Sequence, residues 1–149
     1  MGALVMNKEI VLQLEKISFS HEKGEALQET SIDFYKGENT VILGPNGAGK
    51  SILLKLCHGL LKPATGQLNF KNDGQNTSMV FPKPIFFRRT VLENLEYVLE
   101  VKGVNKALQK ETALDALTQF SMSDFAQYPA RNLSSGEKQR LSVIRALLI

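Results

Sequence analysis

The spacing of apolar residues predicts strands in the first part of the chain. Within residues 12–34, apolar and polar residues alternate, and the parity slips between Leu14 and Ile17, which indicates a bulge or a bend. A turn is expected at residues 36–39. Residues 40–43 are apolar and β-branched without alternation, a pattern typical of a strand that is buried on both faces. We therefore expect a pair of strands followed by a buried strand.

Further along the chain, apolar residues recur at the spacing of helices. The segments with this spacing cover residues 50–61, 90–101, 105–120 and 134–148. Thr90 and Glu93 form a capping box, a common start of a helix. Two more short strands are expected at residues 66–70 and 77–81. Because strands come first, helices follow, and a buried strand enters a helix through glycines, the pattern predicts an α/β fold.

Composition and charge narrow the classes of function. The chain has 149 residues, of which 43% are hydrophobic and 22% are charged, and its net charge is +3. So small a basic surplus gives no reason to expect a nucleic-acid partner. No apolar run approaches the ~20 residues that span a bilayer, and the first six residues lack the pattern of a signal peptide. Cys57 is the only cysteine, so we expect a cytosolic protein in which Cys57 has a packing role.

A glycine-rich stretch between the expected buried strand and the first helix carries the strongest chemical signal. It fits the pattern G-x-x-x-x-G-K-[ST], and it runs Gly44, Pro45, Asn46, Gly47, Ala48, Gly49, Lys50 and Ser51. Glycines let backbone N–H groups approach phosphate oxygens, next to the positive end of the helix. Lys50 would lie between the β- and γ-phosphates, and Ser51 would give its hydroxyl to Mg²⁺. We therefore predict a nucleotide site made of these residues and Ile52.

A second motif opens the last expected helix. It runs Leu133, Ser134, Ser135, Gly136, Glu137, Lys138, Gln139 and Arg140. By itself it is explained by a capping box, with Ser134 as the N-cap and Glu137 three residues later. Together with the phosphate loop, however, it resembles the nucleotide-binding domain of ABC transporters, whose second motif has the form LSGGQ. The resemblance covers essentially the whole chain, because segments at residues 17–20, 87–95 and 142–147 follow in the order of the family.

This resemblance implies a P-loop NTPase core with N-terminal antiparallel strands and a helical subdomain. It divides residues 1–149 into a core at 1–89, a helical subdomain at 90–133 and a signature helix at 134–149. In the family, two such domains bind head to tail and enclose two ATP molecules between them. The resemblance therefore implies ATP and Mg²⁺ as cofactors and a second ATP-binding domain as a partner. The residues expected to contact the partner's ATP are Ser134, Ser135, Gly136 and Glu137.

The resemblance also implies a transmembrane permease as a partner, which would place the chain in the cytoplasm at the inner face of the membrane. We expect an ATP-binding subunit of an importer, in which ATP binding and hydrolysis drive the permease. A basic cluster of Lys83, Arg88 and Arg89 would face the permease, with Phe86 and Phe87 as docking residues. The alternative, drawn from the residues alone, is a core pair of phenylalanines beside solvated arginines, and both interpretations stay open.

Four positions depart from the pattern of the family. Ser135 replaces the first glycine of the signature motif, and Glu137 replaces its glutamine and adds a negative charge. His21 stands where the family has an aromatic residue that stacks on adenine, although a histidine exposed at a strand end is an equally good interpretation. Pro82 stands where a glutamine would reach the metal and the attacking water, and proline has no side-chain donor or acceptor. The resemblance therefore leaves metal sensing and coupling at Pro82 in question.

Several functional residues of the family have no counterpart in this sequence. They are the metal-holding Asp after a buried strand, the catalytic Glu that follows it, and the switch His. The sequence ends in an apolar run at residues 147–149, so we interpret it as the N-terminal part of a longer protein, with the C-terminal strands of the core missing. We expect it to bind ATP without hydrolysing it. Two alternatives stay open: a non-hydrolysing nucleotide-binding module, and a soluble ABC protein without a role in transport.

Overall fold

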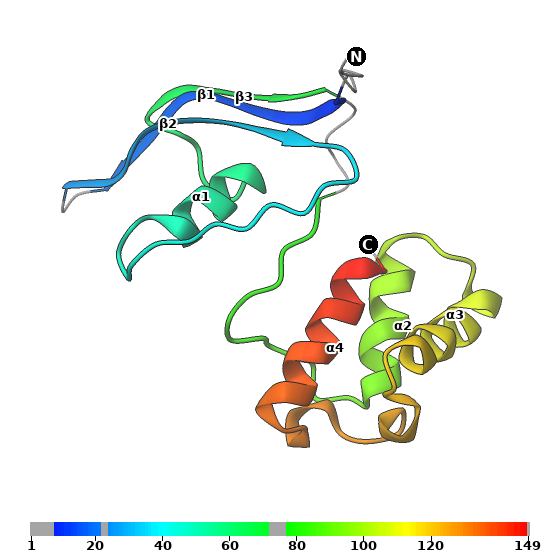
Figure 1. Ribbon diagram of the computed structural model, residues 1–149. Coiled ribbons are helices and arrows are strands. Elements are labelled where there is room, and N and C mark those ends of the chain that lie inside the picture. Colours follow the sequence, from blue (N-terminus) through cyan, green and yellow to red (C-terminus); the bar gives the residue numbers. More distant parts are fainter. Residues whose placement is uncertain (1–7, 22–23, 72–76, 149) are drawn as a thin grey trace, which may run out of the picture. The chain divides into compact units, whose positions relative to one another are not determined.

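The computed structural model of the chain describes residues 8–21, 24–71 and 77–148. The chain divides into two compact units, Met1–Asn76 and Thr77–Ile149 (Figure 1). In the described residues, strands and a helix make up the first unit, and helices make up the second. The predicted α/β class is therefore confirmed. The finer boundaries that the resemblance implies at residues 89 and 133 stay predictions.

An antiparallel sheet forms the frame of the first unit. Its strands are β1 (Ile10–His21), β2 (Gly24–Tyr35) and β3 (Thr65–Phe70), in the order β2-β1-β3. The register shifts between Leu14 and Ile17, which confirms the predicted bulge. Both residues are buried. The bulge therefore brings apolar side chains on either side of it to the same face of the sheet.

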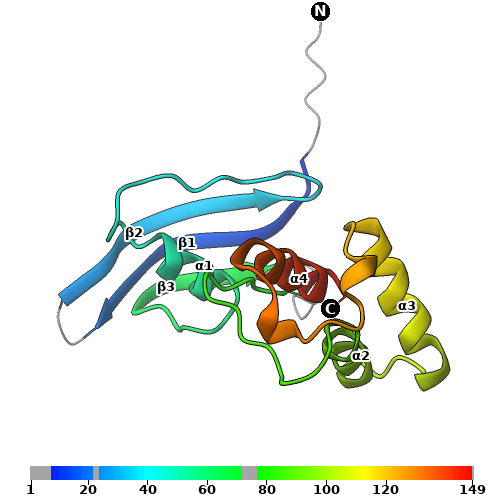
Figure 2. The ribbon, with the colours of Figure 1, turned by 90° about the horizontal axis from the view of Figure 1, so that it is seen from below.

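Helix α1 (Lys50–Cys57) lies against one face of this sheet (Figures 1 and 2). The buried apolar residues of the unit come from both layers, and they are Leu12, Leu14, Ile17, Leu27, Leu53 and Leu56. The helix ends at Cys57 and not at residue 61, because Gly59 turns the chain with a φ of 80°. Cys57 is half-buried against this cluster, and burial raises the pKa of its thiol, as its predicted packing role requires.

Two of the predicted strands are wrong. Residues 40–43 and 77–81 have no regular secondary structure, and the side chains of Val41 and Leu43 are 76% and 86% exposed. A strand is held by hydrogen bonds to a neighbouring strand, and within the described residues the sheet contains β1, β2 and β3 alone. An apolar, β-branched run therefore forms a strand only where a second segment supplies the other half of the ladder.

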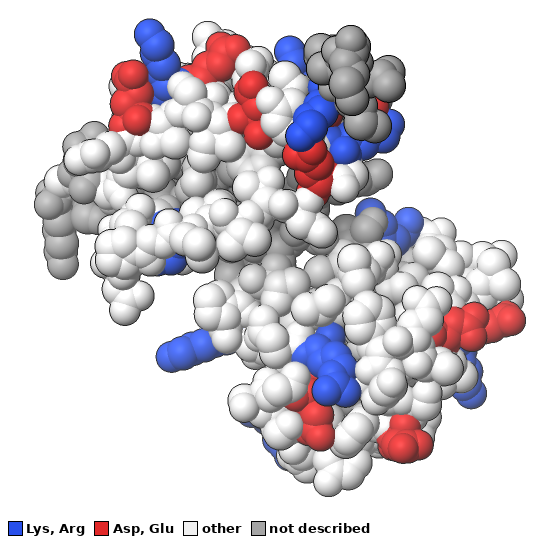
Figure 3. All heavy atoms as spheres, viewed as in Figure 1, with Lys and Arg blue, Asp and Glu red and all other residues white. Residues whose placement is uncertain are grey.

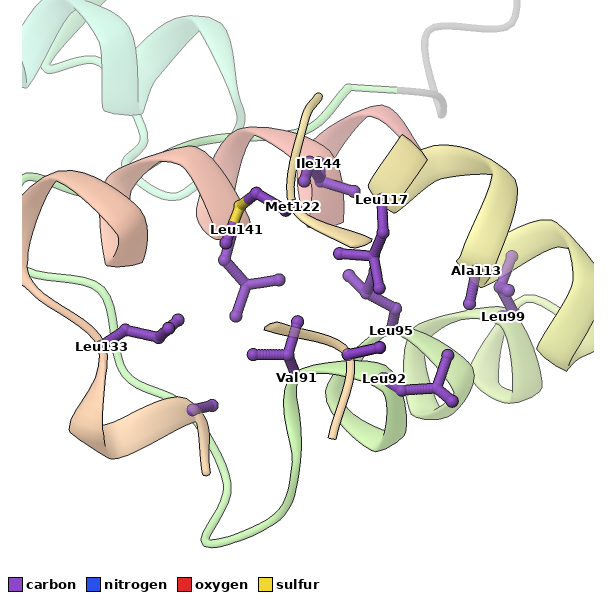
Figure 4. Packing of buried hydrophobic residues seen from close by; sticks show 12 residues of the cluster. Val91, Leu92, Leu95, Leu99, Ala113, Leu117, Met122, Leu133, Leu141 and Ile144 are labelled. Carbon is purple, nitrogen blue, oxygen red and sulfur yellow. The ribbon is translucent and has the colours of Figure 1, made fainter. Parts of the chain in front are cut away.

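Helices form the frame of the second unit, as their apolar spacing predicts. They are α2 (Val91–Val101), α3 (Lys106–Gln119) and α4 (Ser135–Leu147), with short 3-10 turns at Ser123–Phe125 and Ala130–Asn132 between the last two. Their buried side chains converge on one core (Figure 4), which consists of Val91, Leu92, Leu95, Leu99, Ala113, Leu117, Met122, Ala126, Ala130, Leu133, Leu141 and Ile144. None of the described helices is long and apolar enough to cross a membrane.

The start of α2 confirms the predicted capping box. The N–H of Glu93 donates to the hydroxyl of Thr90 at 3.1 Å, and the N–H of Thr90 donates to the carboxylate of Glu93 at 2.7 Å. These bonds lower the pKa of the Glu93 carboxyl. Two N–H groups that a helix start would leave without acceptors are thus satisfied by side chains.

Candidate functional site

The predicted phosphate loop enters α1 through two glycines with left-handed backbones. Gly47 has a φ of 86° and Gly49 a φ of 81°. A Cβ at Gly49 would lie 2.8 Å from the carbonyl oxygen of Ala26 and 3.0 Å from Cδ1 of Leu27, so only glycine lets the loop pack against β2. A Cβ at Gly47 would meet no described atom within 4 Å. Packing therefore requires glycine at one position, and backbone conformation alone favours it at the other.

Backbone N–H groups are the main donors of this loop. Ala48 donates its N–H to the carbonyl of Pro45 at 3.3 Å, whereas the N–H groups of Gly47, Gly49 and Lys50 meet no acceptor among the described residues. Gly49 is the N-cap of α1 and offers no side-chain acceptor, and the first turn of the helix carries no acidic residue. The positive end of α1 is therefore open toward the loop, an arrangement that binds anions.

Lys50 adds a charged donor to the same loop. Its Nζ donates to the carbonyl oxygens of Gly44 at 2.9 Å and Pro45 at 2.7 Å, which holds the ammonium on the loop. Ser51 follows it in the first turn of α1 and is exposed. N–H groups and an ammonium fit the phosphates of a nucleotide, and a hydroxyl is an oxygen ligand of the kind that Mg²⁺ binds. The residues of the loop therefore fit both groups.

The other residues predicted for the nucleotide site have varied surroundings. Asn46 is exposed in the turn of the loop. Ile52 is partly buried and packs on the apolar cluster of the first unit, so its side chain supports α1. The backbone of His21 ends β1 opposite Gly24. The side chain of His21 lies outside the described residues, and its stacking on adenine stays a prediction.

The signature motif forms the start of α4 in the second unit. Ser134 is the N-cap: the N–H of Glu137 donates to its hydroxyl at 3.4 Å, and its own N–H donates to the Glu137 carboxylate at 2.7 Å. The side chain and backbone of Ser134 lower the pKa of the Glu137 carboxyl. The predicted capping box is confirmed. Ser135 and Gly136 are exposed on this first turn, so the motif offers their N–H groups to solvent while Glu137 is engaged by its own helix.

The two phenylalanines before α2 have different surroundings. Phe86 packs on the core of the second unit, with the Arg145 guanidinium 5.0 Å from its ring centroid. Phe87 is 49% exposed, and its ring meets that of Tyr97 at 4.7 Å between centroids. The two residues are therefore not a core pair. Pro82 is exposed in a stretch without regular structure.

Asn94 is a residue that the sequence analysis did not single out. It is 1% exposed. Its side chain accepts the N–H of Phe87 at 3.0 Å and donates to the carbonyl of Thr90 at 2.8 Å. Asn94 thereby anchors the segment that precedes α2. Its place between Leu92 and Leu95, beside the apolar face of the predicted helix, was the signal that could have found it.

Comparisons with known proteins agree with this geometry. Residues 27–149 match the ABC transporter family. The chain is 32% identical over 152 residues to the spermidine/putrescine import ATP-binding protein PotA of Acetivibrio thermocellus, covering 96% of this chain and 43% of that protein. It is 34% identical over 138 residues to the zinc import ATP-binding protein ZnuC of Vibrio vulnificus, covering 93% of this chain and 51% of that protein.

A solved structure has the same fold. It is cbiO1 from Clostridium perfringens, part of the ABC transporter complex cbiONQ, with a TM-score of 0.81 at 24% identity over 95% of this chain and 62% of that chain. The chain spans about half the length of the curated relatives described above.

Proposed function

The chain belongs to the ABC transporter family, and from this premise we propose that it is an ATP-binding subunit of an importer. PotA and ZnuC are import ATP-binding proteins by name, which favours import as the direction of transport. One observation supports the assignment of the nucleotide site most strongly. The loop at residues 44–51 combines open N–H groups with the ammonium of Lys50, at a helix start that has no acidic residue. A trianionic or tetra-anionic ligand suits such a site.

In this proposal, the N–H groups of residues 47–50 and the ammonium of Lys50 bind the phosphates of ATP. Lys50 exchanges the carbonyl oxygens of Gly44 and Pro45 for phosphate oxygens, which are stronger acceptors because they are charged. Ser51 offers its hydroxyl to Mg²⁺, which supplies neutralisation of phosphate charge when it is bound. The chain's own residues thus bind and orient the nucleotide.

We extend the proposal to two partners. Ser134, Ser135, Gly136 and Glu137 would contact ATP held by a second ATP-binding domain, in a head-to-tail pair. The first turn of α4 supports this role, because Ser135 and Gly136 are exposed and a Cβ at Gly136 would meet nothing within 4 Å. A membrane permease would receive the motion of the pair, at the cytoplasmic face of the membrane. Hydrolysis and transport belong to the proposal for the whole protein, and binding alone is proposed for these residues.

A nucleotide titration tests the proposal. A fluorescent ATP analogue is titrated with the unaltered chain, with Lys50→Ala, and with Lys62→Ala as a control that removes an exposed lysine from the same unit. We expect Lys50→Ala to weaken binding about tenfold or more, because a charge-assisted bond is lost. Lys62→Ala should bind like the unaltered chain. Equal affinities of all three chains would overturn the nucleotide site.

A further inference from the structure

A cavity of about 440 Å³ opens on the second unit and has a strongly basic lining. It is lined by Arg88, Arg89, Thr90, Glu93, Pro129 and Arg131. The lining therefore holds three guanidinium groups and one carboxylate. Over the face of the molecule in Figure 3, Lys and Arg lie among Asp and Glu. None of these residues has a part in the nucleotide site.

The backbone around the cavity joins two segments that are distant in the sequence. Thr90 and Pro129 form an antiparallel bridge. The N–H of Ala130 donates to the carbonyl of Arg89 at 3.0 Å. These bonds hold the segment that carries Arg89 against the segment that carries Arg131, so their guanidinium groups line one cavity.

The buried side chain of Asn94 fixes the first of these segments from the core side. It accepts the N–H of Phe87 and donates to the carbonyl of Thr90, with further contacts of its amide at 3.4 Å to the carbonyls of Phe87 and Arg89. A segment held by a buried amide is already ordered before a ligand arrives. The entropic cost of binding at the two arginines on it is therefore lowered.

The side chains of Arg88, Arg89 and Arg131 donate no hydrogen bond to another described residue, so their N–H groups are available to a ligand. The carboxylate of Glu93 accepts the N–H of Thr90 at 2.7 Å and the hydroxyl of Thr90 at 2.9 Å, so it pairs with Thr90 and not with an arginine. Arg89 lies over the rings of Phe87 and Tyr97, 5.8 Å from each centroid, which orients the guanidinium without using its donors. The two salt bridges found in the described residues involve none of the three arginines.

We propose that Arg88, Arg89 and Arg131 bind a phosphate group, at a site additional to the one for ATP. Guanidinium groups bind phosphate through paired N–H donors in a fixed geometry. A doubly or more highly charged anion compensates three guanidinium groups beside one carboxylate, whereas a single carboxylate leaves them in excess. Free diphosphate and the headgroup of an anionic lipid both present this chemistry.

Calorimetric titration with inorganic diphosphate tests whether the arginines bind a free phosphate compound. The full chain with Lys50→Ala serves as the parent, so that the phosphate loop contributes little to diphosphate binding. The test variant carries Arg131→Gln in addition to Lys50→Ala. Lys110→Gln is the matched control, since Lys110 is exposed on α3 and the charge change is equal. We expect Arg131→Gln to weaken binding about tenfold and Lys110→Gln to leave it within about twofold. Circular dichroism checks that the helices of each variant remain intact.

Sedimentation with vesicles tests the lipid source. The same chains are mixed with phosphatidylcholine vesicles that contain phosphatidic acid, a phosphate monoester. Loss of vesicle binding in Arg131→Gln but not in Lys110→Gln supports a lipid headgroup, and the corresponding result with diphosphate supports a free ligand. The proposal is overturned if neither probe binds, or if both variants weaken binding equally. Lys50 is already replaced in the parent, and Arg131 and Lys110 both lie outside the phosphate loop, so these outcomes do not bear on the ATP site.

Discussion

The two motifs of this chain both stand at the start of a helix, yet the two starts differ. α1 begins after Gly49, which has no side-chain acceptor, and its first turn has no acidic residue. α4 begins after Ser134, and Ser134 and Glu137 each accept an N–H from the other. The first N–H groups of any helix need acceptors from outside the helix ladder. In α4 the Ser134 hydroxyl accepts the N–H of Glu137, while Ser135 and Gly136 stay exposed. In α1 no side chain accepts any of these N–H groups.

This difference favours ligand binding at the start of α1. A helix start without a side-chain cap keeps its N–H groups available to an anion, whereas a cap stabilises the terminus from within the chain. We therefore expect nucleotide binding by the isolated chain to depend on the residues before α1. The cap of α4 should affect the stability of the second unit and leave that binding unchanged.

The largest effect is expected from Gly49→Ala. Its Cβ would press against the carbonyl of Ala26, and its φ of 81° is unfavourable for alanine. We expect a loss of stability of about 2 kcal/mol or more, together with loss of nucleotide binding. Gly47→Ala is the matched control, because it has a similar φ but open space, and it should cost about 1 kcal/mol. Urea unfolding and nucleotide titration measure both, and equal effects would show that packing against β2 is unimportant.

A smaller effect is expected from Ser134→Ala. The variant removes the acceptor for the Glu137 N–H and should cost about 1 kcal/mol in thermal unfolding followed by circular dichroism. Ser135→Ala, an exposed position one residue later, should be close to neutral. ATP affinity of the isolated chain should be the same in both variants. A loss of affinity in Ser134→Ala alone would contradict the proposed division between the two helix starts.

The smallest effect concerns acid pH. The bonds from Ser134 lower the pKa of Glu137 below its usual 4.5, so its stabilising contribution is complete above that value and disappears as the pH falls through the lowered pKa. Glu137→Gln should therefore lose less helical stability than the unaltered chain between pH 6 and pH 3. Glu111→Gln is the control, because the side chain of Glu111 makes no hydrogen bond among the described residues. If the stability of all three chains depended equally on pH, the Glu137 carboxylate would have no part in stabilising α4.

Local signals in the sequence were sufficient for the starts of α2 and α4. Thr90 with Glu93 and Ser134 with Glu137 are spaced three apart, and α2 and α4 begin where this spacing predicts. The bonds involved join neighbouring residues, so a short stretch of sequence contains all of them. The strand expected at residues 40–43 depends instead on a partner segment, which an apolar run cannot reveal.

The candidate sites divide in the same way. The phosphate loop is contiguous, so its residues could be predicted from the sequence alone, and their role in nucleotide binding stays a prediction. The arginine cavity is not contiguous: the pairing of Thr90 with Pro129 brings Arg131 to Arg89. The sequence showed Arg88 and Arg89 as neighbouring basic residues, but nothing in it indicated that Arg131 lines the same cavity.

Backbone hydrogen exchange distinguishes the two helix starts, because it reports both of them in one experiment. Exchange is followed by mass spectrometry with and without Mg·ATP, at a concentration where the chain is monomeric. We predict that the nucleotide slows exchange at residues 44–52 and leaves residues 134–138 unchanged. Slower exchange at residues 134–138 with no change at residues 44–52 would show that the nucleotide binds at the start of α4 and not at the start of α1.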